Sequence, residues 1–272
     1  MRKIVHLLPA LFLIGMLFTA PNLAHAVVAH KNFIFGADST QSLASQTGAK
    51  SKITIVVPQT FSASGEDHNW HVEGTDSSGY KHLAGYFVNT ASPSTPKFFA
   101  EEFLGGVRKL SYQGTASVGN NGDQKYFAFH KPSSGTWQYY VDNSPQTGGV
   151  STATSLNVST LYALAEKICP TSPYCTKDQG GPMPSINMEN AMMYTSSSSY
   201  LGTWNAVTNA QAYYQYINSD GSSSSGSGAQ SEMCQPMSMK GKVQDATLVN
   251  NRMIIGNNVV TTCTTANNAL WP

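Results

Sequence analysis

Charged side chains are scarce in this sequence. Asp, Glu, Lys and Arg make up 11% of the 272 residues, and the formal net charge is +1, whereas an ordinary soluble domain carries about 25% charged residues. A nucleic-acid-binding protein needs a basic face, and a coiled coil needs many Glu, Lys, Leu and Ala residues, so the composition excludes both classes. The polar residues are instead mainly 32 Ser and 24 Thr, beside 40% apolar and 10% aromatic residues. This composition has enough apolar residues for a core and is typical of a secreted β-protein.

Long apolar runs are almost absent as well. The single example extends from Ile4 to Phe18, after Arg2 and Lys3 and before the small-residue site at 24–26. This order predicts a secretory signal peptide that is cleaved near Ala26. The run is shorter than the ~20 residues that span a bilayer. We therefore expect a mature chain without a membrane span, located in the periplasm or outside the cell.

The sequence has four cysteines, Cys169, Cys175, Cys234 and Cys263. An even number in an exported chain favours disulfides. Three pairings are possible, and we favour Cys169 with Cys175 and Cys234 with Cys263. A metal site fits less well, because there is no Cys-x-x-Cys motif and no histidine near these cysteines. The sequence predicts no metal ion and no cofactor.

Strand patterns dominate the rest of the chain. Short runs of β-branched or alternating residues are separated by Pro, Ser and Gly, which predicts an antiparallel β-sandwich or jelly roll. The expected domains are a signal peptide at 1–26, an N-terminal extension at 27–50 and one sandwich domain at 51–272. A flexible Ser/Gly loop is expected at 219–228. The clearest predicted strands lie at 53–57, 68–73, 81–89, 97–103, 107–113, 124–130 and 136–142.

One segment has helical spacing. Its apolar residues are Val158, Leu161, Leu164, Ala165 and Ile168. Ser159 or Thr160 can cap a helix there and Pro170 can end it, so we predict one short helix packed on the sheet.

Three glutamates are candidate catalytic acids. Strand alternation places Glu101 and Glu102 on opposite faces, so one of the two must point to the apolar or concave side. Burial there would raise its pKa and suit it to general acid catalysis. Glu189 is a lone carboxylate among Met and Ala residues. The alternative is that all three are ordinary half-exposed strand residues.

Acids and histidines also gather at residues 66–73. His68 and His71 are three residues apart, so a strand would place them on opposite faces. We therefore expect a hydrated surface here, not a metal site.

Aromatic residues on strands are candidates for ligand contact. Flat rings can stack on sugars or grip an extended peptide, although alternate rings must belong to the core. The candidates are Trp70, Trp137, Tyr139, Tyr140 and Tyr214.

The order of several motifs resembles the glutamic peptidase (eqolisin) family. These motifs are Trp70, Lys-His-Leu-Ala-Gly-Tyr at 81–86, Phe-Phe-Ala-Glu-Glu-Phe at 98–103 and Gly-Thr-Trp-Gln-Tyr-Tyr-Val-Asp at 135–142. The resemblance implies a concanavalin-like sandwich and an endopeptidase active in acid. In that family a Glu acts as general acid/base on a water, and a Gln stabilises the tetrahedral intermediate. Glu189 is the nearest counterpart of that Glu.

The chain departs from the family at the glutamine, whose position is occupied by Leu83, two residues before Gly85. Losing one such hydrogen-bond donor costs about 10²–10³ in rate. Unless Gln138 substitutes, the resemblance implies a binding face without activity.

Three hypotheses follow. The first is a secreted, non-catalytic sandwich that binds an extracellular glycan or peptide on an aromatic face. The second is an extracellular hydrolase, a peptidase or glycosidase, that uses Glu189 with Glu101 or Glu102. The third is a structural component of a cell surface or matrix. None of them involves nucleic acid, and the oligomeric state is left open.

Overall fold

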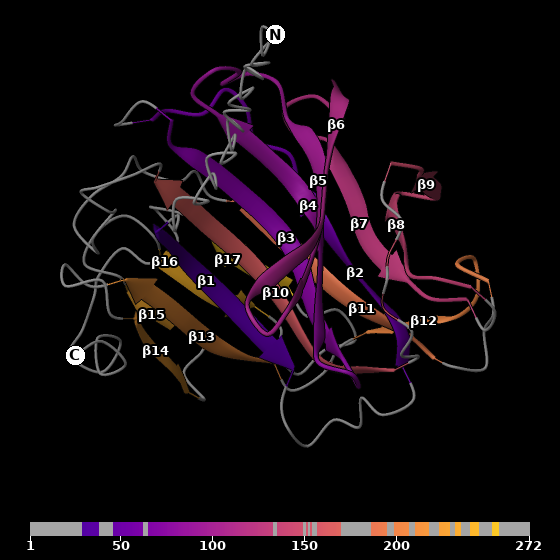
Figure 1. Ribbon diagram of the computed structural model, residues 1–272. Coiled ribbons are helices and arrows are strands. Elements are labelled where there is room, and N and C mark those ends of the chain that lie inside the picture. Colours follow the sequence, from indigo (N-terminus) through magenta and orange to yellow (C-terminus); the bar gives the residue numbers. More distant parts are fainter. Residues whose placement is uncertain are drawn as a thin grey trace, which may run out of the picture.

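The protein is an all-β sandwich (Figure 1). In this computed structural model, no described residue is helical. The described residues are 29–37, 46–61, 65–132, 135–148, 151, 153, 157–169, 186–194, 199–206, 210–217, 223–228, 232–234, 240–244 and 252–255.

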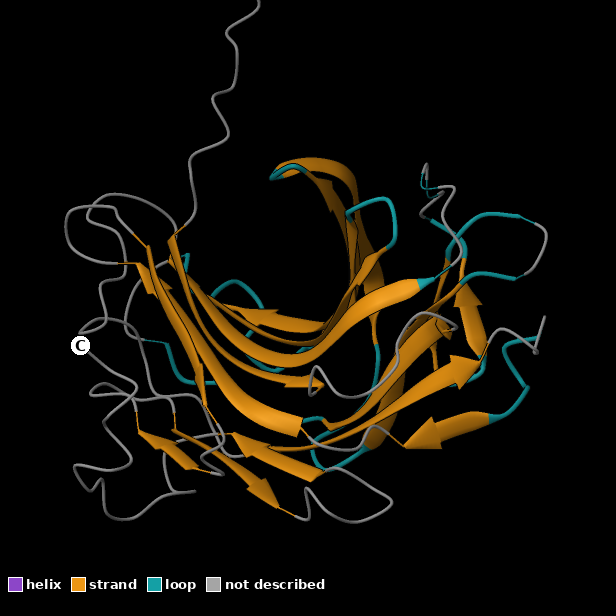
Figure 2. Cartoon of the chain, turned by 90° about the horizontal axis from the view of Figure 1, so that it is seen from below, coloured by secondary structure: helices purple, strands orange, loops and turns teal. Residues whose placement is uncertain are grey.

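The first sheet is antiparallel and has the order β6-β5-β4-β3-β10-β1-β13-β14. It bends so that its outer face, turned away from the second sheet, is concave (Figure 2). The hairpin of β5 and β6 rises along one side of that face. The strands are β1 (Ala29–Ala37), β3 (Asp67–Asp76), β4 (Tyr80–Asn89), β5 (Lys97–Leu104), β6 (Val107–Ser117), β10 (Val158–Cys169), β13 (Ala210–Ile217) and β14 (Ser223–Gly228).

The second sheet is also antiparallel, in the order β9-β8-β7-β2-β11-β17-β16-β15, with β12 paired to β11. The two sheets are joined by backbone pairing at one position, where Val158 of β10 lies opposite Gln46 of β2. The strands are β2 (Gln46–Thr54), β7 (Gln124–His130), β8 (Gln138–Val141), β9 (Ser144–Gln146), β11 (Ile186–Tyr194), β12 (Trp204–Ala206), β15 (Glu232–Cys234), β16 (Lys240–Gln244) and β17 (Arg252–Ile255).

Aromatic rings fill the space between the sheets. Trp70 of β3 stacks on Tyr86 of β4, with ring centroids 4.9 Å apart. Phe98 of β5 lies parallel to Phe127 of β7 in the opposite sheet, and all four side chains are buried. Alternation sends every second residue of these strands into the core, and the others form the outer faces.

The predicted helix is wrong. Residues 158–169 form β10, which pairs with β3 on one side and β1 on the other. Leu161, Ala163 and Ala165 are buried, and so is Leu164 of the opposite face. A strand buried on both faces reads as a continuous apolar run, and periodicity alone cannot distinguish such a run from a helix.

Two predicted domain limits also need correction. The described part of the predicted extension at 27–50 belongs to the sandwich, since 29–37 form β1 inside the first sheet and β2 begins at Gln46. Within the predicted Ser/Gly loop, 223–228 form β14, which pairs with β13. Serine and glycine carry a weak strand signal, so composition hid this strand.

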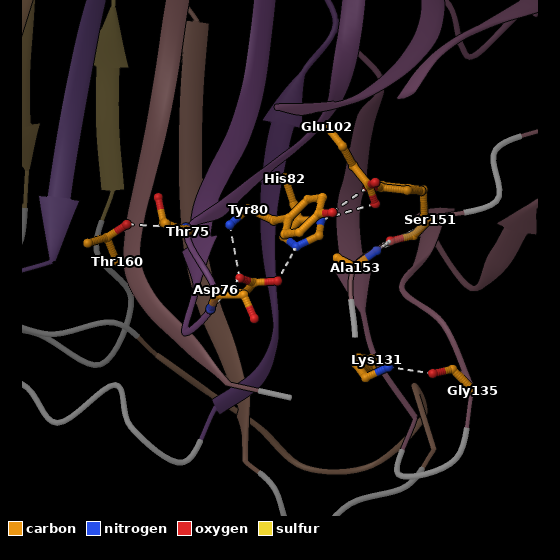
Figure 3. A network of polar contacts seen from close by, with 12 residues as sticks. Thr75, Asp76, Tyr80, His82, Glu102, Lys131, Gly135, Ser151, Ala153 and Thr160 are labelled. Carbon is orange, nitrogen blue, oxygen red and sulfur yellow. Dashed lines mark hydrogen bonds and ion pairs between the residues drawn. The ribbon is translucent and has the colours of Figure 1, made fainter. Parts of the chain in front are cut away.

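A buried polar network lies within the aromatic core (Figure 3). His82 Nε2 is 3.1 Å from Asp76 Oδ2, and His82 Nδ1 is 3.4 Å from Glu102 Oε1. The Tyr139 hydroxyl donates to the same Glu102 oxygen over 2.7 Å. Burial alone would raise the pKa of Glu102, but hydrogen bonds from His82, Ser151 and Tyr139 outweigh it and hold that pKa below its ordinary value. The ionised form of Glu102 is therefore favoured inside the core.

Aromatic residues also gather on the outer face of the second sheet. Lys50 Nζ is 4.5 Å from the ring centroids of both Tyr126 and Trp204. Tyr140 and Tyr200 stack with centroids 4.0 Å apart. These contacts pack residues 199–205 onto the sheet.

His130 lies beside Tyr140 and Tyr200, and burial lowers its pKa to about 4. The neutral imidazole is favoured in the folded state. Its contribution to the free energy of unfolding is therefore complete above about pH 6.5 and is lost as the pH falls towards 4. The shift corresponds to roughly 3 kcal/mol. We expect His130→Phe to flatten the fall in unfolding free energy between pH 6.5 and 4, measured by urea denaturation. An unchanged pH dependence would contradict this.

Candidate functional site

The concave face of the first sheet carries a cluster of charged side chains. Residues opposite one another in an antiparallel pair share a face, so the register identifies its members. Glu73 lies opposite both Leu83 and Tyr162, and Leu83 lies opposite Glu101. The charged and titratable residues of this face on β3, β4, β5, β6 and β10 are Asp67, His71, Glu73, Lys81, Lys97, Glu101, Arg108, Tyr162 and Glu166.

Glu73 is held between two basic groups. Lys81 Nζ lies 2.8 Å from Glu73 Oε1, and His71 Nε2 lies 3.9 Å from Glu73 Oε2. Burial alone would raise the pKa of Glu73, but His71 and Lys81 outweigh it, so this pKa is lowered. Glu73 is therefore a fixed negative charge at neutral pH.

Glu101 is the carboxylate with the opposite shift. Burial raises its pKa, Arg108 offsets part of the effect and Glu166 adds to it. Its side chain is 17% exposed, and Arg108 lies 3.3 Å from Glu101 Oε1. A carboxyl with a raised pKa that still reaches solvent can exchange protons or receive a cation from a ligand.

Glu166 lies on the neighbouring strand β10. Asn69 donates a hydrogen bond from Nδ2 to Glu166 Oε2 over 3.3 Å, and both residues are buried. Glu166 also acts electrostatically on Glu101 and on Lys81. The face therefore joins acids from three strands.

An apolar patch adjoins these acids. Leu83, Phe87 and Phe99 form a buried cluster on the same face, and Phe103 packs against it. His71 packs edge-on against Phe99, and neither ring nitrogen has a hydrogen-bond partner among the residues that the structure describes. A buried polar group of this kind is one that a ligand can satisfy.

The three predicted catalytic acids do not converge. Glu101 lies on the concave face, whereas Glu102 points into the core network, as strand alternation predicts. Glu189 belongs to β11 of the second sheet, where its Oε2 is 2.6 Å from Lys52 Nζ. Glu101 is thus the member of this set that lies within the concave cluster.

Most of the predicted ligand-contacting aromatic residues are core residues. Trp70, Trp137 and Tyr139 are buried between the sheets, and Tyr140 is buried on the outer face of the second sheet under Tyr200. The side chain of Tyr214 lies outside what the structure describes. Alternation identifies two faces but not which of them is the core, and this caused the error.

Gln138 does not lie near Leu83. It is exposed on β8 of the second sheet, where it accepts a hydrogen bond from the Tyr140 hydroxyl. Leu83 is buried on the concave face, between Glu73 and Glu101 in the register. The glutamine expected at this position is therefore not replaced by Gln138.

Sequence reasoning missed Glu166, Glu73, Asn69 and Arg108 as members of a site. Glu166 fell in the segment with helical spacing. Reading that segment as a strand would have placed Tyr162, Leu164 and Glu166 on one face. The cross-strand partners come from register, which one sequence does not show.

Other predictions stay untested. The proposed signal peptide at 1–26 lies outside the described residues, as do Cys175, Cys263 and the side chains of Cys169 and Cys234. In the described part of the chain, no group of three or more His, Cys, Asp or Glu residues is placed to hold a metal ion. A search of the same residues finds no helix able to cross a membrane.

The fold and the site together define a β-sandwich with a cluster of charged side chains on its concave face. No protein-family model and no curated protein matches the chain. Similar solved structures include scytalido-glutamic peptidase with a transition state analog inhibitor, at 11% identity and a TM-score of 0.45, covering 85% of this chain and 100% of that one. Another is SCP-B, a member of the eqolisin family, with a tripeptide, at 10% identity and a TM-score of 0.37, covering 85% and 98%.

A native glycosidic hydrolase is also similar, at 12% identity and a TM-score of 0.31, covering 52% of this chain and 78% of that one. The structural neighbours include a member of the family that the sequence motifs resemble. The site itself is defined by contacts within this chain.

Proposed function

We propose that the protein is an exported binding protein that holds an extended peptide along the concave face of its first sheet without cleaving it. The observation that carries this proposal is the pairing, on one face, of the acids Glu73, Glu101 and Glu166 with the apolar patch around Phe99. Export rests on the predicted signal peptide at 1–26.

A peptide suits this face better than a glycan. Carboxylates accept hydrogen bonds from backbone N–H groups, and an apolar patch takes a side chain from an extended chain. Sugar binding depends on accessible flat rings. Trp70, Trp137 and Tyr139, the rings predicted for that role, are buried in the core.

Binding without turnover follows from the side chain at position 83. Leu83 cannot donate a hydrogen bond to a developing oxyanion, and the loss of one donor costs about 10²–10³ in rate. Gln138, the substitute suggested by the sequence, belongs to the other sheet.

Acid hydrolysis is a second candidate, favoured by one arrangement. The Asn69 amide beside Glu166 places a donor and a carboxylate 3.3 Å apart on the concave face. Glu166 would then act as general base on a water, and Asn69 would stabilise the oxyanion.

The test compares two identical substitutions on different sheets. The full chain is expressed, and the exported protein is titrated with fluorescent capped nonapeptides of Val, Thr and Ser. We expect Glu166→Gln to weaken binding about tenfold, since hydrogen bonds to charged groups contribute about 1.5–3 kcal/mol. Glu189→Gln, on the second sheet, should leave the dissociation constant unchanged.

Failure of every peptide to bind, or equal effects of the two substitutions, would overturn the proposal. A parallel glycan array separates sugar from peptide binding. To detect hydrolysis, the folded chain is incubated with a denatured protein as substrate at pH 3 to 7. Cleavage products that disappear with Glu166→Gln or Asn69→Leu would favour the hydrolase instead.

A further inference from the structure

Arg108 occupies a small subsite at the open edge of the concave face. Its Nη2 lies 3.3 Å from Glu101 Oε1, and its guanidinium carbon lies 5.6 Å from the centroid of the Phe103 ring. A carboxylate and an aromatic face together are the surroundings that a cation prefers. Because the guanidinium of Arg108 occupies this position, the position accepts a cationic group.

The contact with Arg108 is replaceable. Its side chain is 50% exposed, and an exposed ion pair contributes only about 0.2–1 kcal/mol. It extends from β6, which pairs with β5 and forms the edge of the first sheet as the structure describes it. A cationic side chain arriving from solvent can therefore compete with Arg108 for Glu101.

The surrounding charges favour a cation. Burial and the neighbouring Glu166 disfavour the ionised form of Glu101, and a positive charge beside the carboxylate, which Arg108 now supplies, offsets part of both effects. Lys81 is engaged with Glu73 over 2.8 Å. Lys97, opposite Phe87 on the same face, and Asp67 are the remaining charged groups there.

His71 supplies an independent indication of a ligand. Its side chain is only 1% exposed, and its Nε2 lies 3.9 Å from Glu73 Oε2, beyond hydrogen-bond distance. Nδ1 likewise has no hydrogen-bond partner among the described residues. It lies opposite Gly85, between Glu73 and the Phe99 ring. A peptide backbone that passes the apolar patch would bring its N–H and C=O groups towards the ring nitrogens of His71.

We infer that the concave face selects extended peptides carrying a lysine or arginine, whose cationic group takes the place of Arg108 on Glu101 and over the Phe103 ring. The aliphatic stem of that side chain lies along the patch of Leu83 and Phe99. Arg108 is then a competitor built into the site. This inference rests on the proposed function and specifies its ligand.

The experiment uses three capped nonapeptides of Val, Thr and Ser that differ only at the central residue, which is lysine, norleucine or glutamate. Each is titrated against the wild-type chain, Arg108→Ala and Lys109→Ala by fluorescence anisotropy. Lys109 is the exposed neighbour on β6, so its replacement removes the same charge but keeps the contact that Arg108 makes with Glu101. Thermal unfolding of each variant verifies that it is folded.

Arg108→Ala should lower the dissociation constant of the lysine peptide about three- to fivefold, which corresponds to the free energy of an exposed ion pair. In Arg108→Ala the preference for lysine over norleucine should reach about tenfold, the lower end for a charge-assisted hydrogen bond. Lys109→Ala should show the wild-type preference, and the glutamate peptide should bind most weakly. Glu101→Gln should reduce the preference for lysine.

Equal effects of the two alanine variants, or equal binding of lysine and norleucine peptides, would overturn the inference. The proposed function would survive that result, because the norleucine peptide still reports binding to the face. If no peptide binds at all, both fail.

Discussion

Replacing His82 with leucine is expected to lower the free energy of unfolding by roughly 3–5 kcal/mol, the cost of leaving buried carboxylates without their polar partner. The imidazole lies between two carboxylates, with nitrogens 3.1 Å from Asp76 and 3.4 Å from Glu102, and all three side chains have no exposed surface. Leucine would leave two buried acids without the group that separates them. Urea denaturation at pH 7 measures the loss.

The matched control is an ion pair on the surface. Lys125 Nζ lies 3.1 Å from Asp142 Oδ2, with side chains 29% and 41% exposed. Lys125→Met should cost less than about 1 kcal/mol. If both substitutions cost the same, the buried network does not stabilise the sandwich.

The pH dependence of the His82→Leu variant separates charge from packing. The variant's two buried carboxyls have a raised affinity for protons, so the neutral acids are favoured in its folded state. The sign follows from linkage: a raised pKa contributes stability at low pH that is lost as the pH rises. The difference in free energy of unfolding between the wild-type chain and the variant should therefore be smaller at pH 4 than at pH 7. A deficit independent of pH would indicate a packing defect alone.

The sandwich could be predicted because alternation and turn residues are local properties. Trp70 and Val72 fall on one face of a short run, and both are core residues. The failure at 158–169 has a physical cause: β10 is an interior strand with buried apolar residues on both of its faces, such as Ala163 and Leu164, so its apolar residues do not alternate. Length would not have resolved it either, because this strand is as long as an ordinary helix.

The candidate site was less predictable, because it depends on register. Alternation correctly separates Glu101 from Glu102, but it does not show that Glu101 comes opposite Leu83 and shares a face with Glu166. Those relations span β5, β4, β3 and β10 and are set by tertiary packing. The motif at 81–86 identified the position of Leu83, but the charged partners around it come from three other strands.

Gly85→Ala is expected to be nearly as damaging as loss of His82, at about 3 kcal/mol or more. A Cβ at this position would lie 2.1 Å from the Trp70 carbonyl oxygen and 2.4 Å from the His71 Cβ. The first contact is with backbone of the adjacent strand β3, which cannot move aside without breaking the β3–β4 ladder. Unfolding free energy and the yield of soluble protein measure the effect.

Gly114→Ala is the matched control, because it adds the same methyl group to the same sheet. There the nearest atom, Phe98 Cβ, is 3.4 Å away, an ordinary contact. We expect the unfolding free energy to change by less than about 1 kcal/mol and in the stabilising direction, since alanine restricts the unfolded chain. Equal losses at both positions would contradict the proposed clash. A large loss at Gly85 alone would mean that the close approach of β3 and β4 beside His71 requires a glycine at this position.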